Sequence, residues 1–295
     1  MSTTLRVLSC CILASLGPVA QATEGGGSTY PVGAESFMSG VMPPPGFYGQ
    51  VFSTHYEADT LRGNDGRSLP VDFRVRANVV APRLIWVTEQ QVLGGSLAFA
   101  ALFPLVDLKV EVNGQSQSKR GLGDIIFGPA LGHHYSDKLH SVVALDFIAP
   151  SGEYDRGDLA NIGRNYWTIE PVLAISHVDP AGLNASAKIM YDFNLENSAT
   201  DYRSGQEFHV DYALGWGLGN GWVLGVGGYY YRQTTDDRQN GERIEDNKGR
   251  AFAIGPSAMY SSKDGWFVTA KWEQESQVRN RAEGDAYWLK LTVPF

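Results

Sequence analysis

The chain has 295 residues, with 24 lysines and arginines against 32 aspartates and glutamates, and a formal net charge of −8. This acidic balance, without a basic cluster, disfavours nucleic acid as a partner. Both cysteines lie among the first 22 residues, so the rest of the chain lacks the thiols that a small disulfide-stapled domain needs.

Residues 1–22 have the pattern of a secretory signal peptide. Arg6 gives a positive start, residues 7–16 form an apolar stretch, and Ala20-Gln21-Ala22 is an A-x-A cleavage site. The apolar stretch is shorter than the roughly 20 residues that a membrane anchor needs. A lipoprotein reading of Cys10 or Cys11 is disfavoured because the apolar stretch before them is too short. We therefore expect an exported protein of the Gram-negative cell envelope.

Residues 23–46 form a lead segment rich in glycine and then proline, with "GGGSTY" followed by "VMPPPG". Three consecutive prolines favour an extended path without strand pairing. An extended segment of this length either enters a barrel lumen as a plug or lies in the periplasm.

From residue 47 to residue 295 the chain shows period-two alternation of apolar and polar residues, which predicts β-strands with two different environments. In "LNASAKIMYDFN", for example, every second residue from Leu183 is apolar. No run of about 20 apolar residues follows the signal, which excludes a transmembrane helix but not a β-barrel. Twelve strands are expected, near 47–58, 71–87, 96–110, 124–135, 139–148, 168–177, 183–194, 207–216, 222–233, 250–260, 266–275 and 287–295.

The connections between these strands alternate in length. Residues 149–167 and 234–249 are long and charged, whereas 136–138, 178–182 and 217–221 are short. Long loops at one end and tight turns at the other are typical of a transmembrane antiparallel β-barrel of the outer membrane, with extracellular loops and periplasmic turns. Aromatic residues at strand ends fit the girdles at the membrane interfaces: Trp167, Trp216, Trp222, Tyr260 and Trp266.

The last strand ends in an aromatic residue, with Tyr287, Leu289, Leu291 and Phe295 on one face. In a barrel one face meets lipid and the other the lumen, and the strand closes the sheet because unpaired backbone in hydrocarbon is costly. A terminal aromatic on such a strand resembles the signal that barrel-insertion machinery reads. The alternative, a soluble β-sandwich, fits the signal peptide, the loop asymmetry and Phe295 less well.

Several motifs resemble the meta-pathway phenol-degradation family of outer-membrane proteins. They are "PPPG" (43–46), Gly123-Asp124, "PSGEYD" (150–155), "NIGRNYW" (161–167), "TDYRSG" (200–205), Gly255-Pro256 and Arg279-Asn280-Arg281. The resemblance covers nearly the whole chain after the signal. It implies passage of hydrophobic or aromatic compounds across the outer membrane, with outer-membrane lipid as surroundings. It brings no catalytic residues and no cofactor.

Two local patterns suggest chemistry but have simpler explanations. His134 and Ser136 have the H-x-S spacing of outer-membrane lipases, yet Ser136 falls in a short turn, opposite the rim where outer-leaflet lipid would be cleaved. Acidic residues at 236–246 would suit calcium but equally a solvated loop. No spacing of metal ligands stands out, so we expect neither a metal site nor an enzyme.

Charged residues expected to face the lumen are the best candidates for contact with a solute. They are Arg74, Arg76, Asp146, Glu170, Lys188, Asp192, His209, Asp211, Lys271, Glu273 and Lys290. They suit either a polar channel or a lumen filled by ion pairs. A channel for small hydrophobic or aromatic compounds is the leading hypothesis. A lipid-modifying enzyme and a sealed structural or adhesive barrel remain the alternatives.

Overall fold

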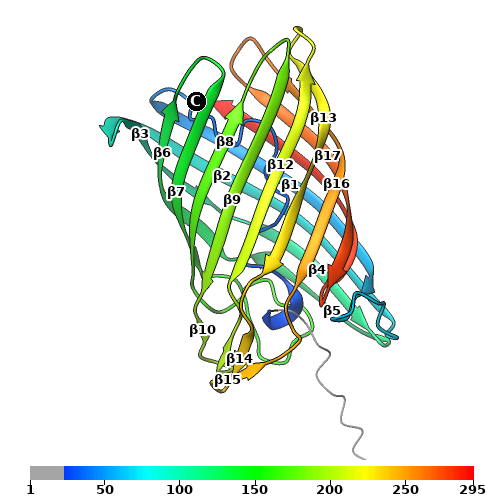
Figure 1. The fold of residues 1–295 in the computed structure, drawn as a ribbon. Helices are drawn as coiled ribbons and strands as arrows, with labels where there is room; N and C mark the ends of the chain where they lie inside the picture. The colour runs from blue at the N-terminus through cyan, green and yellow to red at the C-terminus, as the bar shows by residue number, and fades with distance from the viewer. Residues whose placement is uncertain (1–22) are drawn as a thin grey trace, which may run out of the picture.

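The computed structural model, which describes residues 23–295, is a closed antiparallel β-barrel (Figure 1). The barrel closes because β1 pairs with β2 on one side and with β18 on the other. The strands of its wall are β1 (Gly46–Leu61), β2 (Phe73–Val92), β3 (Gly95–Leu102), β4 (Leu105–Val112), β5 (Gln115–Leu122), β6 (Ile125–His134), β7 (Leu139–Ala149), β8 (Thr168–His177), β9 (Leu183–Asn194), β12 (Glu207–Gly217), β13 (Trp222–Gln233), β16 (Arg250–Ser261), β17 (Phe267–Arg279) and β18 (Ala282–Pro294). These fourteen segments make up twelve wall strands, because two of the twelve are interrupted and each of those counts as two segments. The predicted 12-stranded barrel is therefore confirmed.

The interrupted strands are β3 with β4, and β5 with β6. The 20-residue β2 pairs with β3 near one end and with β4 near the other, and the break falls at Phe103-Pro104. Proline has no N–H to donate to the ladder, which explains the break. The expectation that residues 111–123 form a connection is wrong, because β5 lies there and pairs with β4.

The two ends of the barrel differ as the loop lengths predict. The C-terminus and the short turns 136–138, 178–182 and 217–221 lie at one end, and the long connections 149–167 and 234–249 lie at the other, together with two tight turns at 113–114 and 280–281 (Figure 1). Four short strands in these connections form a separate small sheet beyond the wall. They are β10 (Glu196–Asn197), β11 (Tyr202–Arg203), β14 (Asp237–Gln239) and β15 (Glu242–Ile244).

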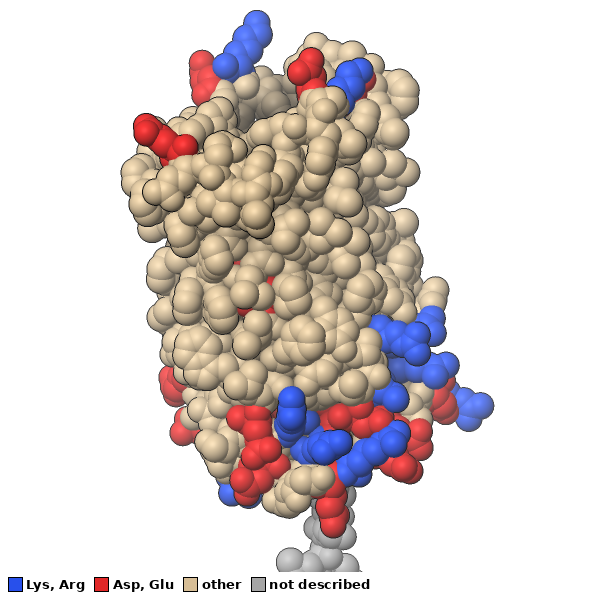
Figure 2. Space-filling view, turned by 60° about the vertical axis from the view of Figure 1, so that its left-hand side comes forward, with Lys and Arg blue, Asp and Glu red and all other residues tan. Residues whose placement is uncertain are grey.

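The outer surface is apolar over a broad band. Figure 2 shows charged side chains gathered towards the two ends of the barrel, with few between them on the face in view. In β18 the predicted alternation holds, since Tyr287, Leu289 and Leu291 are exposed while Lys290 and Thr292 are buried. Such a band, flanked by aromatic residues, is what a barrel needs to contact hydrocarbon. Among residues 23–295, no helix is long and apolar enough to cross a membrane.

The lead segment runs inside the barrel from the long-loop end to the short-turn end (Figure 1). A single 3₁₀ turn, η1 (Glu24–Gly26), lies by the loop sheet, where the Thr23 amide donates to Asp237 at 3.3 Å. Further along, the Gly33 amide donates to Asp211 in β12 at 2.7 Å, and the Gly40 amide donates to Ser176 in β8 at 2.9 Å. The segment is thus hydrogen-bonded to the wall along its length.

Candidate functional site in the barrel lumen

Nine of the charged residues predicted to face the lumen are buried inside the barrel. They are Asp146, Glu170, Lys188, Asp192, His209, Asp211, Lys271, Glu273 and Lys290, each less than a tenth exposed. Most come from β8, β9, β12, β17 and β18. This part of the wall is polar inside, and several of its side chains contact the lead segment.

Arg74 and Arg76 lie on the outer face instead, so their predicted lumen orientation is wrong. Their side chains are about half exposed and approach Glu57 in β1, at 4.0 and 3.3 Å. The neighbouring residues Phe73 and Val75 line a cavity inside the barrel. The prediction assumed polar side chains inside and apolar ones outside, but this part of β2 has an apolar inner face and a charged outer face near the long-loop end.

Glu35 of the lead segment is the centre of the first ionic cluster. Its carboxylate accepts a hydrogen bond from Lys290 at 2.7 Å and lies 3.4 Å from the Arg83 guanidinium. Lys271 donates to its main-chain oxygen at 2.9 Å, and its own amide donates to Asp211. The wall therefore places positive charge beside the carboxylate and the main-chain oxygen of Glu35, and negative charge beside its amide. Sequence analysis missed Glu35 because the lead segment has no strand periodicity.

A second polar cluster lies nearer the long-loop end. Glu275 accepts hydrogen bonds from the hydroxyl groups of Tyr56 and Tyr229. The Arg281 guanidinium lies 4.1 Å from the centre of the Tyr231 ring and donates to Ser28 of the lead segment at 3.0 Å. Sequence analysis missed these residues as well, because their meeting depends on which strands become neighbours.

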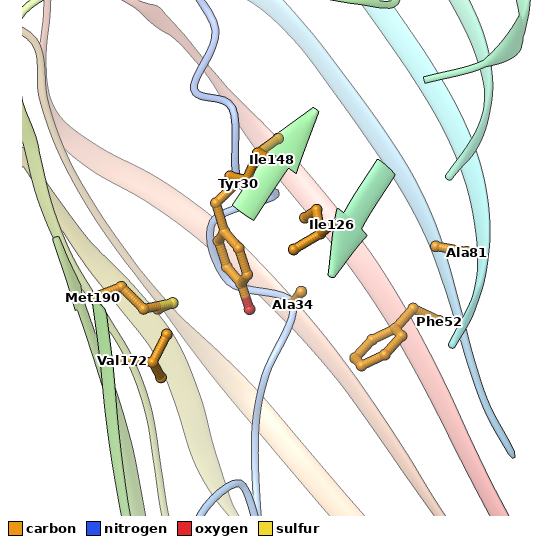
Figure 3. Packing of buried hydrophobic residues seen from close by; sticks show 8 residues of the cluster. All are labelled: Tyr30, Ala34, Phe52, Ala81, Ile126, Ile148, Val172 and Met190. Carbon is orange, nitrogen blue, oxygen red and sulfur yellow. The ribbon is translucent and has the colours of Figure 1, made fainter. Parts of the chain in front are cut away.

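The lumen is hollow beside these two clusters. Two adjoining cavities of about 240 and 410 Å³ lie between the lead segment and a largely apolar part of the wall, and members of both clusters also line them, with Glu35 and Arg83 on the smaller cavity and Glu275 and Arg281 on the larger. Tyr30, Thr54, Ala77, Leu108 and Trp288 line both of them. Figure 3 shows Phe52, Ala81, Ile126, Val172 and other apolar side chains that surround Tyr30 and Ala34 of the lead segment. Small side chains such as Ala77 and Ala81 leave the space open.

The long loop between β7 and β8 closes over β5 at the long-loop end. Lys119 in β5 donates hydrogen bonds to Asp155 and Asp158 of this loop, both at 2.9 Å. The hydrogen bond from Lys119 to Asp158 lowers the pKa of the Asp158 carboxyl. Asn161 and Arg164 of the same loop line both cavities. The loop motif that carries the family resemblance thus forms part of the lumen.

The two chemical patterns noted in the sequence form no catalytic or calcium arrangement among residues 23–295. Ser136 accepts hydrogen bonds from the amides of Lys138 and Leu139, while His134 contacts His140, their Nδ1 atoms 2.7 Å apart. In the acidic loop, the Asp236 carboxylate pairs with Arg243 and Lys248 of its own loop.

One group of buried side chains does combine metal-binding residue types. His209 Nε2 lies 3.2 Å from Asp192 Oδ2 and 3.5 Å from Glu170 Oε2, and all three side chains are fully buried. The three residues lie far apart in the sequence and meet through the pairing of β8, β9 and β12. No short spacing in the sequence identified them.

Comparisons with known proteins agree with this architecture. The model of a family described as "Putative MetA-pathway of phenol degradation" matches residues 58–291. An outer membrane channel from Pseudomonas putida F1 is similar in structure, with a TM-score of 0.75 and 18% identity over 88% of this chain and 98% of that one. The translocator domain of the autotransporter NalP from Neisseria meningitidis is similar at a TM-score of 0.51 and 12% identity, over 86% and 90% of the two chains. Comparison with curated proteins found no match.

Proposed function

We propose that this chain is a channel. It belongs to the MetA-pathway phenol-degradation family, because the family model matches most of its length. Family membership confirms the resemblance drawn from the sequence motifs. The proposed cargo is a small hydrophobic or aromatic compound that crosses the outer membrane through the barrel.

The apolar cavity beside the lead segment carries the proposal. Ligand sites are typically concave, mostly apolar and furnished with a few polar groups that orient the ligand. Here alanine, valine and leucine side chains make up much of the lining, and Thr54, Asn161 and Arg164 add polar atoms to both cavities. Charged side chains border them as well: Glu35, Arg83, Asp146 and Lys188 on the smaller cavity, and Glu273, Glu275 and Arg281 on the larger. An aromatic ring with one hydroxyl group would place its ring against the apolar part of this lining and its hydroxyl group beside a polar one.

The proposed location is the outer membrane of a Gram-negative bacterium, after removal of residues 1–22. The apolar outer band supports contact with lipid. The terminal Phe295, which is largely exposed at the end of β18, is the proposed contact for barrel-insertion machinery.

The lead segment is the proposed constriction of the channel. It lies along the polar wall, held by Glu35 and by backbone hydrogen bonds, and it leaves the largely apolar cavities beside it unfilled. Such a constriction would restrict ions and polar solutes while an apolar path remains. Neither catalysis nor a cofactor forms part of this proposal.

Planar-bilayer conductance of the refolded mature protein, with and without phenol, tests the proposal. We expect small, stable conductance steps that phenol reduces. A chain lacking residues 24–42 should give larger steps, and equal steps would refute the constriction. If conductance and phenol flux into vesicles are both absent after confirmed insertion, the sealed structural barrel becomes the better explanation.

A further inference from the structure

Four acidic side chains form a row across the inside of four neighbouring strands. Asp146 in β7 lies opposite Glu170 in β8, and Asp192 in β9 lies opposite Glu207 in β12. The β8–β9 register also places Glu170 across from Asp192. Asp146 is 6% exposed and the other three are 0% exposed. Like charges directly opposite one another destabilise a sheet, so this row needs positive charge.

The centre of the row is short of partners. Neither carboxylate oxygen of Glu170, nor Oδ1 of Asp192, has a partner at hydrogen-bond geometry within residues 23–295, and Glu170 is left with a 3.5 Å ion pair to His209. Lys188 on β9 interacts electrostatically with Glu170, but its amino group donates to the Tyr30 hydroxyl at 3.2 Å and lies 4.4 Å from that ring's centre. A fully buried carboxylate without a well-formed hydrogen bond is costly, so its retention points to a ligand at this position.

The spacing of the three central side chains fits a metal ion. His209 Nε2 is 3.2 Å from Asp192 Oδ2 and 3.5 Å from Glu170 Oε2. Ligand atoms about 2.1 Å from a tetrahedral zinc ion are separated from each other by roughly 3.4 Å. One ligand atom from each residue lies within 4.8 Å of the others. We propose that Glu170, Asp192 and His209 bind a divalent first-row transition metal, with Zn²⁺ as the representative ion.

The donor set selects among cations. One imidazole nitrogen with two carboxylate oxygens suits Zn²⁺ and its first-row neighbours. Calcium takes six to eight oxygen ligands and seldom a nitrogen. The competing arrangement is a protonated His209 that pairs with both carboxylates and needs no metal. It supplies one positive charge to two buried carboxylates, whereas a divalent cation would supply two.

A metal here would join β8, β9 and β12 at the place where the lead segment rests on the wall. The Tyr30 ring lies 5.1 Å from the His209 ring, centre to centre. The ion would fix the His209 ring and so the surface that Tyr30 contacts. This role is structural and is independent of whether the barrel conducts aromatic compounds.

Zinc retention by the folded mature chain tests the site. His134 and His140 at the short-turn end are first changed to alanine, because this exposed pair offers a competing zinc site. After loading with Zn²⁺ and dialysis, elemental analysis should find one zinc per chain. Asp192→Asn should weaken zinc binding by about 100-fold. Changing a residue that only hydrogen-bonds a metal ligand already costs about 10- to 100-fold in affinity, and Asp192 is proposed as a ligand itself. Glu273→Gln, an equally buried carboxylate on β17, should leave it unchanged.

A second measurement needs no variant that might fold poorly. Zn²⁺ should raise the thermal unfolding temperature of the metal-free parent, and Co²⁺ should give the visible spectrum of a nitrogen–oxygen site rather than that of the hydrated ion. Absence of retained zinc, of the thermal shift and of the cobalt spectrum would overturn the proposal in favour of the protonated-histidine pair. Equal zinc retention by the folded Asp192→Asn chain would also overturn it, as would retention of Ca²⁺ in place of Zn²⁺.

Discussion

Replacing Glu35 with alanine should release the lead segment from the polar wall. The Glu35 carboxylate is buried between Lys290 and Arg83, and its removal leaves the Lys290 ammonium buried without its partner. Loss of one member of a buried ion pair costs about 3–5 kcal/mol. At 1.4 kcal/mol per decade, the ratio of docked to undocked segment falls roughly 100- to 4,000-fold.

Single-channel recording is the assay for this change. Glu35→Ala should show frequent transitions to a larger conductance, and protease should cut the lead segment faster than in the parent. The double variant Glu35→Leu with Lys290→Met should recover much of the docking, because an apolar pair of similar volume often replaces a buried ion pair without loss. Unchanged conductance and protease resistance in Glu35→Ala would refute this reasoning. Equal effects in the single and double variants would show that the ion pair is not the cause.

Two further predictions concern the cavity and the loop above it. Ala77→Phe fills space shared by both cavities, so a barrier of about 1–3 kcal/mol should lower phenol flux roughly 5- to 150-fold, whereas Val80→Phe on the outer face should not. Similar flux through both variants would exclude the cavity as the path. The lowered pKa of Asp158 means that its contact with Lys119 stabilises the loop fully above the ordinary aspartate pKa of about 3.9, and that this stabilisation is lost below it, as pH falls through the lower pKa of the folded chain. A spin label at Leu159→Cys should therefore keep the same mobility from pH 7 to 5 and gain mobility below about pH 4. A Lys119→Met chain should lack that step, and a change already at pH 6 would contradict the assignment.

The barrel and most of its inward charges follow from the sequence because they depend on local alternation. Residues such as Lys188 and Asp211 sit in strands whose outward residues are mostly apolar and whose inward residues are mostly polar, and the pleat puts them inside. Arg74 and Arg76 were assigned to the wrong face because alternation separates two faces of a strand without showing which one points inwards. The inward face was chosen on the assumption of a polar lumen, and that assumption fails where Phe73 and Val75 of β2 line a cavity.

What the sequence could not provide depends on pairing between distant segments. The acidic row exists only because the registers of β7, β8, β9 and β12 bring Asp146, Glu170, Asp192 and Glu207 to the same level. The role of Glu35 depends on where an irregular segment lies, and no periodicity encodes that position. Pairing partners and registers are set by the closed sheet as a whole.

The lead segment also constrains the order in which the molecule is assembled. It occupies the space that the seam between β1 and β18 encloses, and it joins β1 directly through residues 43–45. Threading Glu35 through a finished barrel would strip its charge of water before it reached Lys290 and Arg83. Closing the seam around a segment that already rests on β8 and β12 avoids that barrier. Formation of the β1–β18 pairing should therefore come last, as the step that both completes the wall and traps its contents.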